Sequence, residues 1–285
     1  MKTVLKWAGN KTRVMPELKK YLPAGKRLVE PFAGSCAVMM NTDYDAYLIA
    51  DANHHLVNTY KMMAYHTDAL LAELEALFGG GSVGTESQRA GFYYSVRTSL
   101  NHNGSLSCVE KAAQFIYLNR HGYNGLVRYN QAGAFNVPYG KYKSPYFPGA
   151  EIRAFAEKAK RATFICADFT ETLELVLPGD VIYCDPPYNP LAGKGSFTKY
   201  HSVDFDTVSQ LRLAAMLESL ADKGFPVIAS NSDCALTHSQ YGHGRFDLYK
   251  ISVARSIGAS TGGGNIAAEI IAVRAPAAHQ VRAAS

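Results

Sequence analysis

The chain has 285 residues, of which 47% are hydrophobic and 19% are charged, and a formal net charge of +5 at pH 7. This composition is ordinary for a soluble globular protein, and the length suits one large domain or one domain with an insertion. No apolar run approaches the roughly 18 residues of a transmembrane helix, and the amino-terminal residues lack the apolar core of a signal peptide. The sequence therefore predicts a protein that neither spans a membrane nor is secreted.

The five cysteines are scattered, odd in number and without a Cys-x-x-Cys pair. They indicate neither a zinc site nor a disulfide framework, so we expect no bound metal and a reducing, cytoplasmic compartment. The modest positive charge permits a polyanionic partner without requiring one. We expect no membrane association and no obligatory protein partner, and the chain is predicted to be a monomer.

The amino-terminal segment is apolar at first and breaks at a Gly-Asn turn, with Lys6 and Lys11 on either side of Trp7, the single tryptophan. A short helix is predicted over residues 16–21. The next segment, residues 27–40, has the pattern of a strand, a tight small-residue loop and a helix, which opens a nucleotide-binding α/β unit. Its single glycine, Gly34, predicts a ligand lying against the loop rather than a pyrophosphate wrapped by it.

A second strand, residues 47–51, ends on Asp51, which is placed to accept hydrogen bonds from a ribose diol. The alternative is that Asp51 caps the helix predicted to begin near His54. Helical periodicity then runs from about residue 53 to 97. Within it, the run Gly79-Gly80-Gly81-Ser82 predicts a flexible break.

Residues 119–143 are rich in glycine, asparagine and tyrosine and contain basic side chains but no acid. The sequence Asn130-Gln131-Ala132-Gly133 predicts a hairpin turn. Basic residues that alternate with aromatic and amide side chains are typical of a nucleic-acid-binding surface, where they contact phosphates, read base edges and stack. A solvated hairpin without a partner is the alternative, and the complete lack of acids argues against it.

Three further segments complete the pattern. Residues 163–168 are predicted to form a strand that ends on Asp168. Asp168 would accept a hydrogen bond from an amino group, and Phe169 would cover the face of a purine. The alternative is that Asp168 only caps a helix. Residues 189–204 are a polar loop without apolar periodicity, predicted to act as a lid. Residues 246–254 and 266–273 alternate well enough to pair as an antiparallel hairpin.

The buried strand 181–184 stops at Asp185-Pro186-Pro187-Tyr188. The two prolines remove two N–H donors. The Asp185 carboxylate and the Pro186 carbonyl can therefore accept from an exocyclic amino group while Tyr188 offers a flat face for stacking. We predict that these four residues are the catalytic centre for a planar heterocycle that carries an amino group; a plain surface turn is the alternative.

Because acids follow several strands at what would be one edge, the sequence predicts an α/β fold with a doubly wound, mixed sheet and one antiparallel strand. Residues 54–148 interrupt the strand–helix alternation. They are predicted to be an inserted helical domain that carries the basic hairpin. Residues 1–53 and 149–285 would then form one discontinuous catalytic domain.

The motifs resemble those of the Dam-type DNA adenine methyltransferases, which methylate adenine in GATC with S-adenosylmethionine. The resemblance covers nearly the whole chain and is carried by Leu5-Lys6-Trp7-Ala8-Gly9-Asn10-Lys11, Glu30-Pro31-Phe32-Ala33-Gly34, Asp185-Pro186-Pro187-Tyr188, and Tyr123 to Asn130 with Phe135 to Gly140. The Asp-Pro-Pro-Tyr motif occurs across amino-methyltransferases, whereas the hairpin is much more specific. The resemblance implies a Rossmann-like methyltransferase sheet and a target adenine flipped out of double-stranded DNA.

The resemblance also implies two sets of site residues. The S-adenosylmethionine site would be lined by Trp7, Ala8, Lys11, Glu30, Phe32, Gly34, Asp51, Asp168, Phe169 and Asp185. The DNA-binding set would be Lys6, Arg120, Tyr123, Asn124, Leu126, Arg128, Pro138, Lys141 and Tyr142. This sequence departs from the family pattern at Asn10, where a second glycine is usual, and at Gly262-Gly263-Gly264-Asn265, where some members carry basic residues.

Individual roles follow from the same resemblance. Arg128 would read a guanine and Lys6 would help with the other guanine. Leu126 and Pro138 would meet the thymine methyl. Tyr123 would wedge into the duplex, and Asn124 would fill the space beside the orphaned thymine.

The same catalytic residues would also hold the amino group of cytosine, and the choice of adenine rests on the resemblance alone. Methylation of RNA or of a protein side-chain amide is a further alternative. A DNA-binding protein with a silent cofactor fold is the non-enzymatic one. A carbon-5 cytosine methyltransferase is excluded, because no cysteine stands in the Pro-Cys position that its chemistry needs.

Overall fold

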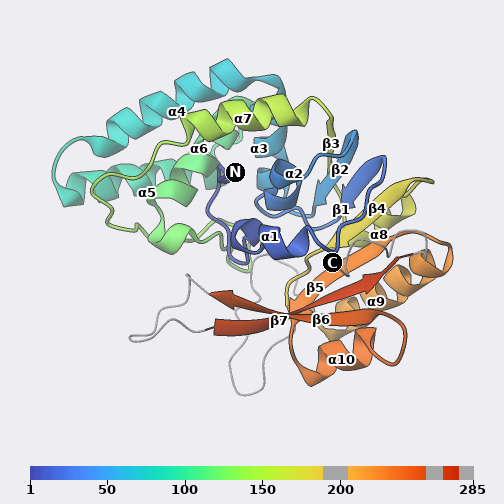
Figure 1. The fold of residues 1–285 in the computed structure, drawn as a ribbon. Helices are drawn as coiled ribbons and strands as arrows, with labels where there is room; N and C mark the ends of the chain where they lie inside the picture. Colours follow the sequence, from blue (N-terminus) through green and yellow to red (C-terminus); the bar gives the residue numbers. More distant parts are fainter. Residues whose placement is uncertain (189–204, 255–265, 276–285) are drawn as a thin grey trace.

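The computed structural model describes residues 1–188, 205–254 and 266–275, so the predicted lid at 189–204 and the departure at 262–265 lie outside the described residues. Its centre is a seven-stranded sheet with the order β3-β2-β1-β4-β5-β7-β6 (Figure 1). The strands are β1 (Arg27–Glu30), β2 (Ala46–Asp51), β3 (Ala162–Cys166), β4 (Asp180–Cys184), β5 (Val227–Ser232), β6 (Asp247–Ala254) and β7 (Ile266–Arg274).

The pairing of these strands confirms the predicted mixed sheet. β1 to β5 are parallel to their neighbours, whereas β7 runs antiparallel to both β5 and β6. β6 and β7 also form the antiparallel pair that the alternation over residues 246–273 predicts. The strand order reverses between β1 and β4, and ligands of doubly wound sheets bind at the carboxyl ends of strands beside such a reversal.

The helices cover both faces of this sheet. Those that the structure describes are α1 (Met15–Leu18), α2 (Ala37–Asn41), α3 (His54–Tyr65), α4 (Thr67–Ser82), α5 (Glu86–His102), α6 (Cys108–His121), α7 (Gly149–Ala159), α8 (Phe169–Glu174), α9 (Thr207–Asp222) and α10 (Ala235–Tyr241), with short 3-10 helices η1 (Lys11–Arg13) and η2 (Tyr123–Gly125). α4, α5, α6 and α7 gather on one side of the molecule, and α3 lies between them and the strands (Figure 1). None of the described helices is long and apolar enough to cross a membrane.

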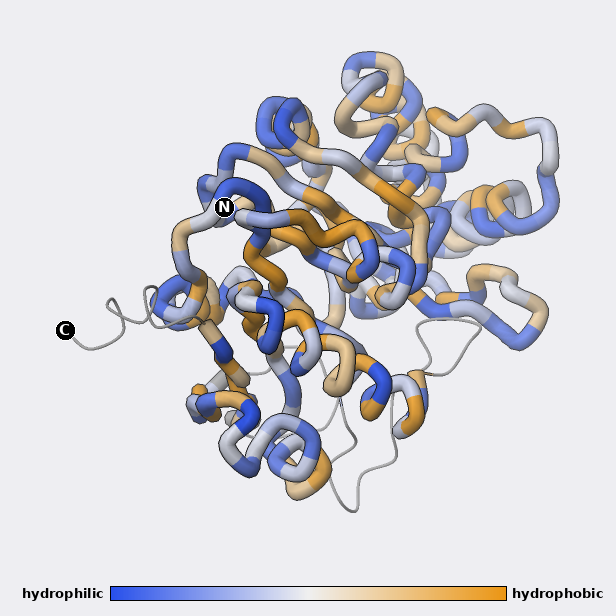
Figure 2. Tube along the Cα trace, turned by 90° about the vertical axis from the view of Figure 1, so that its right-hand side faces the viewer, coloured by the Kyte–Doolittle hydropathy of each residue, from blue (hydrophilic) through white to orange (hydrophobic). Residues whose placement is uncertain are grey.

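Alternation along the strands sends side chains to two cores. On β4, Val181 and Tyr183 join one buried cluster, while Ile182 and Cys184 join the other. The first cluster continues through α3 into Phe115 of α6, so the inserted helices share a core with the sheet. Apolar residues accordingly concentrate in the central strands and hydrophilic ones on the outer turns (Figure 2). The domain boundary at residue 54 stays a prediction.

The predicted break at residues 79–82 is wrong, because α4 runs through all three glycines and ends at Ser82. The reason is packing. A Cβ atom at Gly81 would lie 2.4 Å from the Tyr117 hydroxyl of α6, and one at Gly80 would lie 2.8 Å from the Phe92 ring of α5. These glycines let neighbouring helices approach closely, and tertiary contacts outweigh their poor helix propensity.

The basic hairpin is less regular than predicted. Outside the named strands, isolated bridges pair Gly122 with Tyr139 and Tyr129 with Phe135. The predicted turn is present, because the Gly133 amide donates to the Asn130 carbonyl at 2.9 Å. Side chains of α5 also fasten the hairpin, because Tyr93 and Arg97 donate to the Val137 carbonyl and Asn101 donates to the Phe135 carbonyl.

A matched pair of substitutions tests the packing of α4. Gly81→Ala should destabilise the protein by about 1–3 kcal/mol, because the new methyl group overlaps Tyr117. Gly79→Ala, where no atom lies within 4 Å of the added Cβ, should instead stabilise it by up to about 1 kcal/mol through helix propensity. Urea unfolding followed by circular dichroism measures both. Equal changes at the two positions would contradict the packing explanation.

Candidate active site

The loop after β4 brings the predicted catalytic residues to the carboxyl edge of the sheet. The Asp185 side chain is 20% exposed, and its Oδ2 lies 2.8 Å from Lys11 Nζ. Its Oδ1 is buried and accepts no hydrogen bond within the described part of the chain. Burial raises the pKa of Asp185, and the Lys11 ammonium opposes that shift. One carboxylate oxygen is thus neutralised, and the other is left as an acceptor.

Polar side chains from two distant elements fix the rest of this loop. Gln210 of α9 donates to the Pro187 carbonyl at 2.5 Å and accepts from the Asn231 amide at 3.2 Å. The Tyr188 hydroxyl donates to Glu269 of β7 at 2.9 Å. No local sequence pattern points to Gln210, Asn231 or Glu269, because they stand 21 to 81 residues away in sequence from the groups they contact.

Glu30, at the end of β1, is a buried acid beside this loop. Only 2% of the residue is exposed, and Oε1 accepts no hydrogen bond within the described residues. Burial raises the pKa of Glu30 to about 8, and the nearby Asp185 carboxylate acts in the same direction. Such an orphaned acceptor is suited to a cationic ligand that brings a positive charge and N–H donors.

Asp51 ends β2 and holds the loop after β1. Its Oδ2 accepts from the Gly34 amide at 3.1 Å and its Oδ1 from the Asn53 amide at 2.9 Å. The alternative role as helix cap is wrong, because Asn53 is the N-cap of α3 and accepts from the Leu56 amide. A Cβ atom at Gly34 would lie 2.9 Å from Trp7 Nε1, so Trp7 lies directly against this loop.

Lys11 joins the amino-terminal segment to the loop Asp185 to Tyr188, the predicted catalytic loop. It is 5% exposed, donates to the Gly9 carbonyl at 2.8 Å, and places its ammonium 4.9 Å from the centre of the Tyr188 ring. Asn10, which replaces the usual glycine, accepts from the Thr12 amide and caps η1. Ala8 is half-buried in the same turn.

Phe32 and Phe169 belong to an aromatic group at this edge of the sheet. Phe32 stacks on Phe169 with ring centres 5.6 Å apart, and Phe205 meets both edge-on. The sequence analysis missed Phe205, which precedes α9. Asp168 caps α8 by accepting from the Thr170 amide, so the capping alternative is confirmed, and its contact with a cofactor stays a prediction.

The basic hairpin presents the predicted reader residues outward. Tyr123, Arg128 and Pro138 are exposed, whereas Val127 and Val137 are buried against the helices. The Arg128 guanidinium donates to the side-chain oxygen of Asn136 at 2.7 Å and to its carbonyl at 3.0 Å, which fixes its orientation. Leu126 is half-buried.

The turn that carries Tyr123 rests on the amino-terminal segment. Asn124 adopts a left-handed backbone, and its amide donates to the Tyr142 hydroxyl at 3.1 Å. The Lys6 side chain passes under Gly125 and ends 4.5 Å from the Tyr142 ring centre. Partial burial lowers the pKa of Lys6. Asn119 of α6 fastens this arrangement, because its side chain bonds the Lys6 backbone and the Gly125 carbonyl.

Arg120 differs from the other predicted DNA-binding residues. It is only 7% exposed, and its guanidinium donates to the carbonyls of Thr3 and Val4. This side chain anchors the amino-terminal segment to α6 and does not present its charge at the surface. Lys141 is exposed, and its Nζ lies 3.6 Å from Glu86 Oε1.

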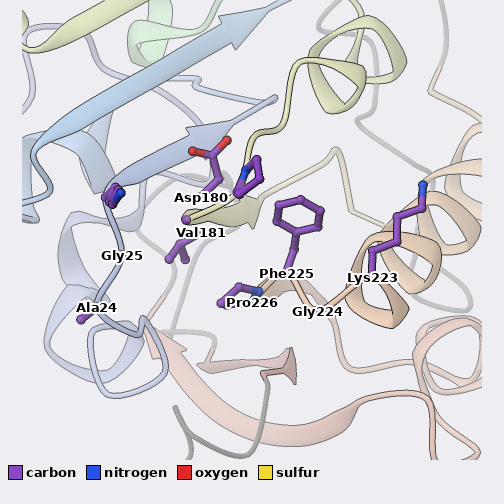
Figure 3. A pocket seen from close by; sticks show the side chains of 11 residues that line it. Ala24, Gly25, Asp180, Val181, Lys223, Gly224, Phe225 and Pro226 are labelled. Carbon is purple, nitrogen blue, oxygen red and sulfur yellow. The ribbon is translucent and has the colours of Figure 1, made fainter.

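A hollow lies at the other edge of the sheet, away from these residues (Figure 3). It is formed where β1, β4 and β5 begin, and its lining includes Gly25, Asp180, Lys223 and Phe225. None of the predicted site residues lines it, and we assign it no part in the site. Among the described residues, no group of three or more histidine, cysteine or acidic side chains could hold a metal ion.

The reversal of strand order, the acids at the carboxyl edge and the proline-flanked acceptor loop define an α/β protein of Rossmann-like methyltransferase type. Residues 7–257 match the model of the D12 class N6 adenine-specific DNA methyltransferases. The Retron Ec67 DNA adenine methylase of Escherichia coli is 53% identical over 273 residues, which cover 96% of this chain and 91% of that protein.

The DNA adenine methylases of Serratia marcescens and of Escherichia coli strain K12 are 41% and 40% identical, over 94% and 95% of this chain and 97% and 95% of theirs. The chain therefore belongs to the D12 class N6 adenine-specific DNA methyltransferase family. It is an adenine-specific DNA methyltransferase. Membership decides between the alternatives that the residues left open: adenine over cytosine, DNA over RNA or protein, and an enzyme over a silent binding protein.

The burial of Glu30 predicts a pH-dependent cost in stability. From the ordinary pKa of 4.5 up to about 8, the unfolded chain loses this proton while the folded chain keeps it. The folded state therefore binds more protons, and stability falls as pH rises through that window. Glu30→Gln should raise the free energy of unfolding at pH 8 by about 1–3 kcal/mol, and by much less near pH 5.

Urea unfolding at the two pH values measures this effect in the protein without ligand. Glu75→Gln, on the exposed face of α4, is the matched control and should change stability little at either pH. An equal gain from Glu30→Gln at both pH values would show that the effect does not come from ionisation.

Proposed function

We propose that the enzyme transfers the methyl group of S-adenosylmethionine to the exocyclic amino group of an adenine flipped out of double-stranded DNA, within the sequence GATC. One observation carries the chemistry: Asp185 Oδ1 is a buried acceptor without a partner among the described residues, beside a loop that has lost two N–H donors. The family supports adenine as the target. GATC is supported by the likeness of the hairpin to that of the Dam-type enzymes.

The residues at the carboxyl edge fit S-adenosylmethionine by their chemistry. Glu30 offers an orphaned buried oxygen to a cationic group, and Asp51 lies at the end of β2, where a ribose diol is bound in doubly wound folds. Phe32 and Phe169 supply apolar ring faces for a purine. Trp7 packs against the loop at Gly34. When bound, S-adenosylmethionine would supply an electrophilic methyl group on a positively charged sulfur.

The catalytic loop would act by positioning. The lone pair of an adenine amino nitrogen is delocalised into the ring, so the nitrogen is a weak nucleophile. Hydrogen bonds from the amino group to Asp185 Oδ1 and the Pro186 carbonyl localise the lone pair and direct it. Tyr188 stacks on the base. Correct alignment of the reacting atoms supplies much of the rate in such a displacement.

The hairpin would supply the recognition of DNA. The target atom lies inside the stacked duplex, so the base must be flipped, at a cost of a few kcal/mol. Exposed Tyr123 is placed to wedge into the duplex and Asn124 to fill beside the orphaned thymine. Arg128 would read guanine in the major groove. Lys6 and Lys11 stand five positions apart on one segment, which ties the hairpin to the catalytic loop.

We further infer that the enzyme works as a monomer in the cytoplasm. All five cysteines are free, which fits a reducing compartment. Sedimentation with and without a GATC duplex tests the oligomeric state.

Replacement of the acceptor tests the chemistry. Asp185→Ala should abolish methyl transfer, and Asp185→Asn should lower it by at least about 100-fold, because an amide replaces one acceptor by a donor. A radiolabelled-methyl assay measures transfer, and circular dichroism checks that each variant folds. Turnover by folded Asp185→Ala near the wild-type rate would refute the assignment.

Replacement of the proposed base reader tests the specificity. Arg128→Ala should cost about 1–3 kcal/mol of discrimination between a GATC duplex and a scrambled one, the usual size of a bidentate guanine contact. Lys223→Ala, at the opposite edge of the sheet, is the control and should leave discrimination unchanged. Binding is measured on both duplexes at one salt concentration. If Arg128→Ala weakens both complexes equally, the residue contacts phosphate instead.

A further inference from the structure

Glu269 is a buried acid that the reaction, as described above, does not use. It stands in β7, is 5% exposed, and accepts from the Tyr188 hydroxyl at 2.9 Å. We propose that Glu269 is a positioning residue, which holds the Tyr188 ring in the orientation that the flipped base needs for stacking. The inference rests on the proposed function, because it concerns the ring on which the target base would stack.

The position of Glu269 is fixed by the sheet. β7 lies between two strands, and residue 269 is aligned with Ser232 of β5 and Ile251 of β6. Backbone pairing on both sides leaves the carboxylate little freedom to follow the loop. Burying a carboxylate is costly unless it is well paired. The Tyr188 hydroxyl supplies one such partner, and a hydrogen bond to a charged acceptor is among the stronger kinds.

Tyr188 stands after two prolines, and its side chain is contacted from outside the loop by Lys11 and Glu269. Rotation about the bond between Cβ and the ring is soft in tyrosine, since this torsion has broad minima. The hydrogen bond fixes the far end of the ring, and the loop fixes its near end. With Lys11 Nζ 4.9 Å from the ring centre, the tilt of the ring is set at three points.

The contact indicates an indirect role. Glu269 meets the phenol hydroxyl of Tyr188, which lies at the end of the ring opposite to the loop. It is comparable to Gln210, which holds the Pro187 carbonyl from α9. Along the loop, Lys11 would thus hold Asp185 at its start, while Gln210 and Glu269 hold Pro187 and Tyr188 at its end. Besides burial, the Glu269 carboxylate also raises the pKa of Asp185, so the proposed positioning effect is the part of its influence on methyl transfer that depends on the Tyr188 hydroxyl.

A double-mutant cycle tests this dependence. The variants are Glu269→Ala, Tyr188→Phe and the double variant, with Glu269→Gln as the conservative replacement. Single-turnover methyl transfer is measured on a GATC duplex. The fluorescence of 2-aminopurine at the target adenine reports how the flipped base stacks. Thermal unfolding and S-adenosylmethionine binding are measured on each variant.

We expect Glu269→Ala and Tyr188→Phe each to slow transfer about tenfold or more, the effect of one lost hydrogen bond to a charged group. The double variant should be no slower than the slower single variant. Both single variants should raise the 2-aminopurine fluorescence relative to the wild-type complex, because the base stacks less well. Glu269→Gln should recover most of the rate, since its amide oxygen still accepts from Tyr188.

Two results would overturn the inference. One is an equal loss from Glu269→Ala in the Tyr188→Phe background, which would show that Glu269 acts independently of the hydroxyl. The other is unchanged transfer and fluorescence in folded Glu269→Ala. Failure of the proposed function has a different signature, because the wild-type enzyme itself would then neither methylate the GATC duplex nor change the 2-aminopurine fluorescence.

Discussion

The ion pair between Lys11 and Asp185 is the interaction on which the site depends. It occupies one oxygen of the Asp185 carboxylate, the proposed catalytic group, and leaves the other as a buried acceptor. Burial alone pushes Asp185 toward the protonated form, which would donate where the mechanism needs an acceptor; the nearby ammonium opposes that shift. The pair also ties the amino-terminal segment to the loop that follows β4. A buried acceptor of this kind needs a cation beside it, and the Lys11 ammonium is that cation.

The same segment relates recognition to catalysis. Between Lys6, under the hairpin turn, and Lys11, which pairs with Asp185, the chain covers only five positions. Asn119 bonds the Lys6 backbone and the turn, and Arg120 bonds the carbonyls just before it. Because the inserted helices share a core with the sheet, the hairpin is held on a rigid support. DNA bound to the hairpin, as proposed, would thereby be positioned relative to the loop that would act on its base.

Buried acids gather near the point where the strand order reverses, and their burial lowers the stability of the fold. Glu30, Asp185 and Glu269 are drawn together at the carboxyl edge, where burial raises the pKa of the first two. Functional sites commonly keep such unfavourable groups because a ligand or a reaction uses them. A cationic cofactor of the proposed kind would offset part of this cost on binding, so stability and ligand affinity would be linked. The family to which the chain belongs carries out chemistry for which this arrangement is suited.

The sequence by itself determined the strands, the mixed sheet with its antiparallel strand, the Asp185 to Tyr188 motif and the acids at strand ends, because periodicity and turn chemistry are local. The predicted break at the glycines of α4 was wrong, and no local pattern indicated the burial of Arg120 or the contacts of Gln210 and Glu269. Those features depend on which elements pack together. Only the tertiary structure brings β7 to Tyr188 across 81 positions of sequence, since a hydrogen bond of that kind leaves no local pattern.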